Sequence, residues 1–210
     1  MSQPVRLYQG TLSSSSWRLR IALALKGIAY DSVQVDIAKE EQYKPAFGEV
    51  APLHQVPCIE IDGHVLYQSV AILEYLDETR PDPRLIPQDA YARAQVRAIV
   101  EVINSVIQPL HNTPVRKRLV EQFGVTMDDA NAWCRYWIEH RFDDLERIIA
   151  ASRGRYAFGD TVTMADVFLY PQIGTCWRFG VDMSKYPVLQ EITTALAHLP
   201  AFSESHPTVA

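Results

Sequence analysis

The sequence predicts a small α/β domain with a mixed sheet, followed by a domain made almost wholly of helices. Short strand-like and helix-like segments alternate up to Thr79, whereas the residues after position 88 carry helical periodicity almost throughout. Between the two parts, residues 80–87 hold three prolines in eight positions. Proline removes a backbone donor and restricts the residue before it, so this stretch is typical of a linker. The predicted fold class is therefore α/β plus all-α.

Local signals predict each element of the first part. Gly27 is suited to end the first helix, because glycine adopts the left-handed conformation of a helix C-terminus. Asp62-Gly63 is a hairpin turn signal between two short apolar runs. Residues 39–47 favour only a weak, polar helix or an irregular turn. The expected strands are residues 5–8, 30–35, 58–61 and 65–67, and the expected helices are residues 14–26 and 69–79.

The second part is expected to begin with one long helical segment over residues 89–121, which Pro109 should kink or break. Thr163 suits a helix N-cap, and Asp166 stands where its carboxylate can reach back to the cap amide. We expect the helix that begins there to run to about residue 179. Another helix at residues 128–151 has large apolar residues at helical spacing, which we interpret as core and not as a cofactor box: Trp133, Trp137, Ile138, Phe142, Leu145 and Ile149.

Composition excludes several classes of protein. Of the 210 residues, 48% are apolar and 21% are charged, which is typical of a globular protein with a packed core. No apolar run approaches the roughly 18 residues of a membrane span, and residues 1–8 lack the pattern of a secretory signal. A net charge of -5 argues against nucleic acid as the main partner. We therefore expect a cytoplasmic protein with no membrane partner.

One short basic cluster, residues 116–118, is open to two interpretations. It is either a solvated helix face or a group that collects an anionic substrate. Three cysteines, Cys58, Cys134 and Cys176, lie far apart, and an odd, sparse set favours reduced thiols. No metal-binding pair of cysteines, no His-Glu-x-x-His and no glycine-rich phosphate loop occurs in the sequence, so we expect no metal site.

The first candidate for chemistry is a run of serines at positions 13–16, between a predicted strand and a predicted helix. One serine suffices as an N-cap, so four in a row exceed what a cap needs. A helix start offers N–H groups and the positive end of the dipole, and hydroxyls added there suit an anion such as a thiolate. A hydrogen bond to a charged acceptor contributes roughly 1.5–3 kcal/mol, so one or two such bonds can lower a thiol pKa by one or two units.

Two further motifs lie in the same part of the chain. A cis bond between Val56 and Pro57 would leave the Val56 backbone open to pair with an extended peptide. Ser69, after Gln68, is a plausible N-cap of the second helix, where capping alone would explain it and where a carboxylate could also bind. Two anion-binding helix starts and a strand edge together fit a short acidic peptide that carries a thiol. Glutathione is such a molecule.

At this point the sequence resembles the glutathione transferases, and the zeta class in particular, from Leu7 to about His206. The most specific piece is residues 13–23, SSSSWRLRIAL, which is similar to the zeta signature Ser-Ser-Cys-Ser/Ala-Trp-Arg-Val-Arg-Ile-Ala-Leu. Further stretches that match family motifs are Val56-Pro57, Gln68-Ser69, residues 107–110, residues 159–166, Pro171-Gln172, Arg178-Phe179 and Val181-Asp182.

The resemblance implies a thioredoxin-like domain over residues 1–82, an all-helical domain over residues 88–210, and a homodimer. It implies three catalytic hydroxyls, of which Ser13 is our choice for the one nearest the thiolate, and an arginine that neutralises a substrate carboxylate. The implied catalytic residues are Ser13, Ser14 and Ser15; the implied glutathione contacts are Gln42, Val56, Pro57, Gln68, Ser69, Gln108 and Asn112; and the implied substrate contacts are Arg18 and Arg178.

Two departures from the zeta pattern bear on the chemistry. Ser15 stands where the signature has cysteine, and a hydroxyl there keeps a good hydrogen-bond donor. Leu12 stands where zeta-class isomerases often carry arginine, which would weaken binding of a dicarboxylate.

The implied activity is glutathione-dependent cis–trans isomerisation of a keto-dicarboxylic acid, maleylacetoacetate to fumarylacetoacetate, by reversible thiolate addition. Maleylpyruvate is a chemically equivalent substrate. The loss of arginine at Leu12 favours a rival, a transferase that conjugates electrophiles or dehalogenates α-haloacids. A second rival is a binding or regulatory module that keeps the fold without the chemistry, although nothing structural needs so many serines.

Overall fold

The computed structural model describes residues 4–206, and it divides into two compact units. One unit comprises Met1–Leu85 together with Leu199–Ala210, and the other comprises Ile86–His198. Our predicted domains, residues 1–82 and 88–210, differ from these units chiefly at the C-terminal end, where the residues from Leu199 group with the first unit. Within residues 4–206, no helix combines the length and the apolar character that crossing a membrane requires.

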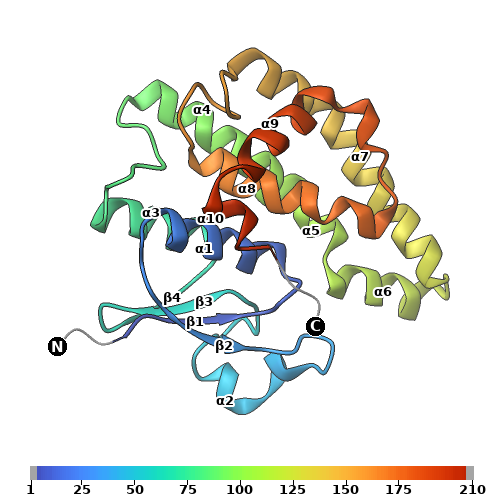
Figure 1. Ribbon diagram of the computed structural model, residues 1–210. Coiled ribbons are helices and arrows are strands. Elements are labelled where there is room, and N and C mark those ends of the chain that lie inside the picture. Colours follow the sequence, from blue (N-terminus) through green and yellow to red (C-terminus); the bar gives the residue numbers. More distant parts are fainter. Residues whose placement is uncertain (1–3, 207–210) are drawn as a thin grey trace. The chain divides into compact units, whose positions relative to one another are not determined.

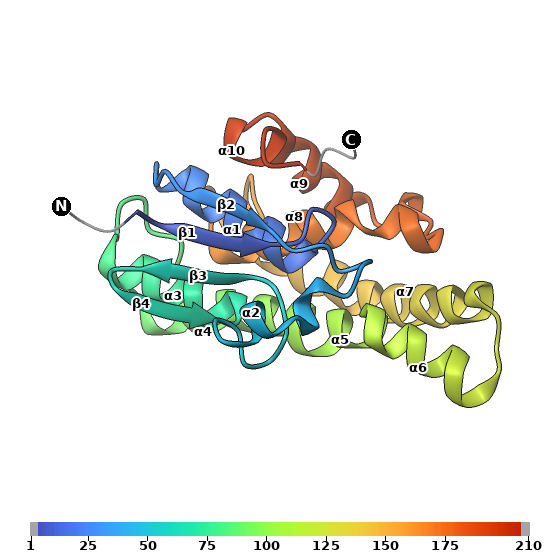
Figure 2. The same cartoon turned by 90° about the horizontal axis from the view of Figure 1, so that it is seen from below.

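The first unit is built on a four-stranded sheet in the order β2-β1-β3-β4 (Figure 2). β1 pairs parallel with β2 and antiparallel with β3, and β3 pairs antiparallel with β4, so the predicted mixed sheet is confirmed. Asp62 and Gly63, both with positive φ, form the predicted hairpin turn between β3 and β4. The strands are β1 (Arg6–Gln9), β2 (Asp31–Gln34), β3 (Cys58–Ile61) and β4 (His64–Tyr67).

Helices cover both faces of this sheet (Figure 1). α1 and α3 pack together on one face, and the short α2 lies on the other. The segment predicted to be a weak helix or turn forms two short turns, η1 and α2. The elements are α1 (Ser14–Leu25), η1 (Glu41–Tyr43), α2 (Pro45–Gly48), α3 (Ser69–Thr79) and, packed on α1 from the C-terminal segment, α10 (Pro200–Ser203).

Both ends of α1 follow the sequence prediction. Ser13 is the N-cap, and its side chain accepts a hydrogen bond from the Ser16 N–H. Gly27, with φ of +62°, follows the last turn, and the Ile28 N–H reaches back to the Leu23 carbonyl at 2.9 Å. This arrangement is a Schellman motif, which requires a left-handed residue that glycine adopts without strain.

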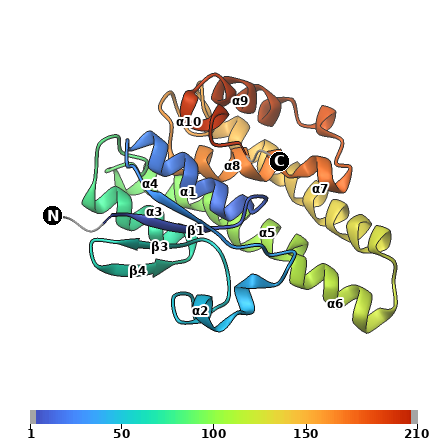
Figure 3. The same ribbon diagram turned by 60° about the horizontal axis from the view of Figure 1, so that its bottom comes forward.

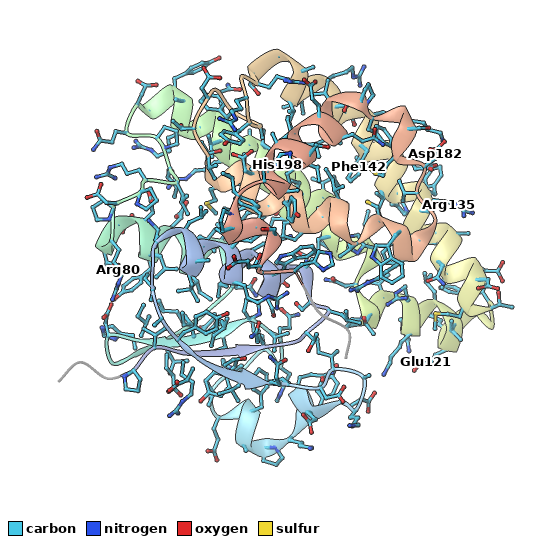
Figure 4. The ribbon with its side chains drawn as sticks, in the orientation of Figure 1. Arg80, Glu121, Arg135, Phe142, Asp182 and His198 are labelled. Atoms are coloured by element: carbon cyan, nitrogen blue, oxygen red, sulfur yellow. The ribbon has the colours of Figure 1, made fainter. Side chains whose placement is uncertain are left out.

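The second unit consists of helices and turns (Figure 3). Phe142 on its longest helix is fully buried, whereas Glu121 on another helix is exposed (Figure 4). The elements are α4 (Ala90–Glu101), η2 (Val102–Ile107), α5 (Gln108–His111), α6 (Thr113–Phe123), α7 (Met127–Ser152), α8 (Met164–Gly174), η3 (Cys176–Phe179), η4 (Met183–Lys185) and α9 (Pro187–Ala197).

The break in the long helical segment lies beyond Pro109. The chain runs from α4 through the π-helical η2 into α5, and it leaves the helical conformation at Asn112, with φ of -65° and ψ of 151°. Pro114 then stands in the first turn of α6, where its missing N–H removes no helical bond. The prediction of an interruption is confirmed, but Pro109 itself lies inside α5.

Not every apolar residue of α7 faces the core. Ile138, Phe142 and Ile149 are fully buried, as predicted. Trp133 is 39% exposed, so its assignment to the core was wrong. Its indole N–H donates to the Leu110 carbonyl at 3.2 Å, and such a polar tip favours a place at the surface.

The start of α8 confirms the predicted cap. The Asp166 carboxylate accepts hydrogen bonds from the N–H and the Oγ1 of Thr163, at 2.8 and 3.1 Å. The helix ends at Gly174, short of the predicted residue 179, and a 3-10 turn follows. Thr175 Oγ1 donates to the Gln172 carbonyl at 2.8 Å, which satisfies an acceptor of the last turn and stabilises the early end.

Candidate functional site

Two serine hydroxyls lie together where α1 begins. Ser13 Oγ and Ser15 Oγ lie 3.2 Å apart, and both residues are half-buried. Because Ser13 accepts from the Ser16 N–H, its own proton stays available to donate. Ser14 is buried beside them, while Ser16 Oγ accepts from the Gly10 N–H and so holds the turn between β1 and α1. The first three residues are the predicted catalytic serines, and Ser16 serves the fold.

The helix start adds positive potential to these hydroxyls. α1 carries no acidic side chain in its first turn that would offset the positive end of the helix dipole. Hydroxyl donors at such a position stabilise an anion such as a thiolate, because both the dipole and the hydrogen bonds favour the charged form. The arrangement therefore suits a ligand that presents a thiol to Ser13 and Ser15.

Val56 lies beside this cluster. Ser15 Oγ makes a long hydrogen bond of 3.5 Å to the Val56 carbonyl, across 41 residues of sequence. The Val56–Pro57 peptide bond is cis. Within residues 4–206, no hydrogen bond is made by the Val56 N–H, so this group can pair with an extended peptide.

A second polar position, after the serine cluster of α1, lies at the start of α3. Ser69 is its first residue and is 5% exposed, and its Oγ accepts from Arg18 Nη1 at 3.1 Å. Gln68 before it has φ of +69°, a conformation that is costly for a residue with a side chain and that clusters at functional sites. Gln68 Nε2 approaches Gln55 Oε1 at 3.5 Å. Arg18 itself is fully buried, so its guanidinium meets Ser69 and has no surface to offer a substrate.

Gln42 lies in η1 and is 8% exposed. Its backbone carbonyl is bonded to His54 Nδ1 at 2.9 Å, which ties η1 to the loop that leads to Val56. Its side-chain Oε1 is buried and has no hydrogen-bond partner among the described residues. An amide with an unused acceptor is consistent with a polar ligand contact at this position.

The remaining predicted contacts belong to the helical unit. Gln108 begins α5 and is half-buried, and Asn112 is exposed just before α6. Arg178 lies in η3, where burial lowers the pKa of its guanidinium and the charge of Arg116 lowers it further. Arg116 of α6 stands over the Phe179 ring at 5.4 Å from its centroid. A second positive charge near Arg178 makes this place favourable for an anion.

The protein's own thiols are poor nucleophiles. Cys58, Cys134 and Cys176 are all free and buried. Burial raises the pKa of Cys58 and Cys134 to about 11, and it raises the pKa of Cys176 further. Because the thiolate is the reactive form, a thiol presented by a ligand is a better candidate nucleophile than these three side chains.

Two family models match the chain. Residues 12–79 match the glutathione S-transferase N-terminal domain, and residues 138–204 match the glutathione S-transferase C-terminal domain. Maleylacetoacetate isomerase of Rattus norvegicus is 47% identical over 203 residues, which cover 96% of this chain and 91% of that protein. The chain belongs to the zeta class of the glutathione S-transferase family.

Solved structures of other glutathione S-transferases agree with this assignment. The holo structure of a bacterial zeta-class maleylpyruvate isomerase is 41% identical, with a TM-score of 0.94 and coverage of 96% of both chains. Maleylacetoacetate isomerase of Anaeromyxobacter dehalogenans, solved with glutathione in its active site, is 40% identical, with a TM-score of 0.88 and coverage of 99% of this chain and 97% of that one. The fold of this glutathione S-transferase is thus the predicted thioredoxin-like domain followed by helices.

Some contacts of this glutathione S-transferase were not predicted from the sequence. His111 Nε2 and Gln172 Oε1 lie 3.2 Å apart and are buried, and the Phe179 ring packs at a tilt against the His111 ring. Trp17 of the signature is tied to the C-terminal segment through its indole N–H, which donates to Ser205 Oγ at 3.0 Å. The histidine directly before Asn112 and the serine near the chain end carry no motif by themselves, since their partners lie 61 and 188 residues away.

Proposed function

We propose that this protein is a glutathione-dependent cis–trans isomerase that converts maleylacetoacetate to fumarylacetoacetate. The hydroxyl cluster of Ser13 and Ser15 at the start of α1 carries the proposal. The relatives also support the proposal, because proteins that are 40–47% identical to this chain are named maleylacetoacetate isomerase or maleylpyruvate isomerase. The reaction belongs to the breakdown of tyrosine and phenylalanine.

The donor sets of the first unit fit glutathione. The hydroxyls at α1 suit its sulfur, the peptide group of Val56 suits its extended backbone, and the start of α3 suits a carboxylate. Pro57, Gln42 and Gln68 complete the proposed set of contacts on this unit, with Gln108 and Asn112 proposed from the helical unit. The buried Gln42 Oε1, which has no partner within the described residues, is the kind of acceptor that a bound peptide would satisfy.

When bound, glutathione supplies a thiolate that adds reversibly to the cis double bond, so that the bond becomes single, rotates, and is re-formed as trans on elimination. Ser13 donates a hydrogen bond that keeps the sulfur ionised at neutral pH. Ser14 and Ser15 extend the same donor group. Arg178 binds a carboxylate of the substrate through its planar guanidinium and thereby orients the double bond toward the sulfur.

Leu12 favours a second candidate, a transferase that conjugates electrophiles or dehalogenates α-haloacids. The side chain is 44% exposed directly before the serine cluster, so it offers apolar surface where an arginine would offer charge. A conjugating enzyme uses the same thiolate, but the adduct leaves as product. Maleylpyruvate is an alternative substrate for the isomerase, since it presents the same conjugated cis double bond and two carboxylates.

We further propose a cytoplasmic homodimer. β4 is an edge strand of the sheet, and its Val65 and Tyr67 are 45% and 44% exposed, so a second copy could cover this apolar strand. The cytoplasmic location is proposed on separate grounds, because three free, buried cysteines are consistent with a reducing compartment.

Light scattering on the purified protein tests the assembly. Twice the 23.8 kDa mass of one chain supports the dimer, and a monomer at micromolar concentration contradicts it.

One assay with two readouts tests the activity. Maleylacetoacetate and, in parallel, maleylpyruvate are incubated with the enzyme with and without glutathione, while the trans product and the free thiol are both measured. We expect isomerisation that needs glutathione and leaves the thiol concentration unchanged. Stoichiometric loss of thiol would instead identify a conjugating transferase. Absence of turnover together with millimolar or weaker glutathione binding would favour the binding module.

A further inference from the structure

Arg18 is a charged residue in a fully buried place. It belongs to α1, on the side where α1 packs against α3, and none of its surface is exposed. Its Nη1 lies 3.1 Å from Ser69 Oγ, although the two residues are 51 positions apart. Burying a guanidinium is unfavourable unless polar partners compensate it, so a packing role alone would be better filled by an apolar side chain.

The chemistry of the two groups fixes the direction of the hydrogen bond. A guanidinium has five N–H donors and no acceptor, so Ser69 Oγ must accept from Arg18. The proton of Ser69 then points to another acceptor. Because the bond comes from a charged donor, it also polarises the hydroxyl and strengthens its donation.

The position of Ser69 makes this donation useful. As the first residue of α3, Ser69 stands among N–H groups that lack partners inside the helix, at the positive end of the dipole. α3 has no acidic residue in its first turn that would offset this potential. The buried Arg18 guanidinium lies within hydrogen-bond distance of Ser69 Oγ, so its charge adds to this potential with little screening by solvent.

We propose that Arg18 is a positioning residue that turns the Ser69 hydroxyl outward as a donor and supplies buried positive charge for one carboxylate of glutathione. The inference deepens the proposed function and rests on it. Arg18 has no exposed surface, so it acts through Ser69 and does not touch the ligand. The carboxylate held in this way is either that of the glutamyl residue or that of the glycine.

The test measures binding by calorimetry for the full-length protein and for Arg18→Met, Arg18→Lys and Arg20→Met. Arg20 is the matched control, because it lies on the same helix but bonds to Gln9 and Ser205. The probes are glutathione, 4-aminobutanoyl-Cys-Gly, which lacks the glutamyl carboxylate, and γ-Glu-Cys-methylamide, which lacks the glycine carboxylate. Failure of the unmutated protein to bind glutathione would contradict the proposed function itself, whereas the outcomes below concern Arg18.

We expect Arg18→Met to raise the Kd for glutathione about tenfold, with kcat at saturating glutathione changed less than about twofold. The loss should disappear for one of the two shortened peptides, the one without the carboxylate held at α3. The Kd of Arg18→Lys, which keeps the charge, should lie closer to that of the native protein. The Kd of the control Arg20→Met should equal that of the native protein. Equal losses for all three peptides, or equal losses in the Met and Lys variants, overturn the inference.

A measurement on the unmutated protein covers the case in which the variants do not fold. With 15N-labelled arginine, the Arg18 guanidinium signal should shift when glutathione is added, and it should shift less with the shortened peptide that lacks the bound carboxylate. Identical shifts with all three peptides, or none with any, overturn the role of Arg18.

Discussion

Lys26 Nζ lies 3.0 Å from Oδ1 of Asp77, and both side chains are buried, so one ion pair joins the end of α1 to the end of α3. The same ammonium group donates to the carbonyls of Arg80 and Pro83, at 2.7 and 2.9 Å. Asp77 in turn accepts from the Leu85 N–H at 2.7 Å. The pair therefore fixes the proline-rich linker as well as the two helices that carry the candidate site.

Removal of one member of this pair should be costly. Lys26→Met leaves the Asp77 carboxylate buried without its counter-ion, and we expect the free energy of unfolding to fall by about 3–5 kcal/mol. Urea unfolding followed by circular dichroism measures the change. Lys44→Met is the control, because it breaks an exposed pair with Glu41 and should shift the midpoint far less. Similar shifts in the two variants would contradict a structural role for Lys26.

Ser13→Ala should lower turnover at least about tenfold, because the thiolate loses the donor proposed to keep it ionised. The absorbance of the thiolate near 240 nm, followed against pH with glutathione bound, should show the pKa of the sulfur moving upward. Ser16→Ala is the control: its Oγ accepts from the Gly10 N–H, so this change should reduce stability and leave the sulfur pKa alone. Near-normal turnover in Ser13→Ala would shift the assignment to Ser15, for which the same measurement decides.

Arg178→Ala should mainly raise the KM for the diacid and leave the affinity for glutathione unchanged. The guanidinium is half-buried near Arg116, so an anion gains from its charge in a place that water screens poorly. Steady-state kinetics at saturating glutathione separate KM from kcat. Arg118→Ala, on the exposed face of α6, controls for net charge. An unchanged KM in Arg178→Ala would remove this residue from the substrate site.

Asp166 should make stability depend on pH. Burial raises the pKa of its carboxyl from 3.8 to about 6, although bonds from Ala157 and Thr163 oppose the shift. Because the pKa of Asp166 is raised in the folded state, its protonation stabilises the fold fully below about pH 4. This contribution to the free energy of unfolding is lost as pH rises through about 6. At 1.36 kcal/mol per unit, the loss is about 3 kcal/mol.

The comparison of native protein with Asp166→Asn isolates this contribution, because the variant has no titrating group at the position. The unfolding free energy of the native protein minus that of the variant should fall by about 3 kcal/mol between pH 4 and pH 7. Urea unfolding at each pH gives the values. A difference that stays constant, or that grows with pH, would show that Asp166 does not titrate in this range.

Features that depend on neighbouring residues were predictable from the sequence. The Ser13 cap, the Gly27 helix end and the Asp62-Gly63 turn each involve groups within a few positions of one another. The reach of Asp166 to Thr163 is of the same kind. Such signals are local hydrogen bonds and backbone conformations, which the side chains themselves favour.

Where the predictions failed, hydrophobic periodicity did not fix the limits of a helix or of its buried face. Periodicity marks a helix such as α7, but it does not fix how far the buried stripe extends, and Trp133 lies outside it. The interruption at Asn112 and the early end of α8 at Gly174 involve local groups, Pro114 in the first turn of α6 and the hydroxyl of Thr175 on the Gln172 carbonyl. Periodicity does not mark them, because it does not distinguish one residue near a helix end from the next.

The sequence by itself determined the family, the alternation of elements and the row of hydroxyls at the first helix start, because these depend on residue types at short spacing. Only the tertiary structure brought Ser15 to Val56 and buried Arg18 behind Ser69. It also tied Trp17 to Ser205 near the end of the described chain. These partners are 41 to 188 residues apart, so no local propensity links them, and they meet only when the sheet and its helices are packed.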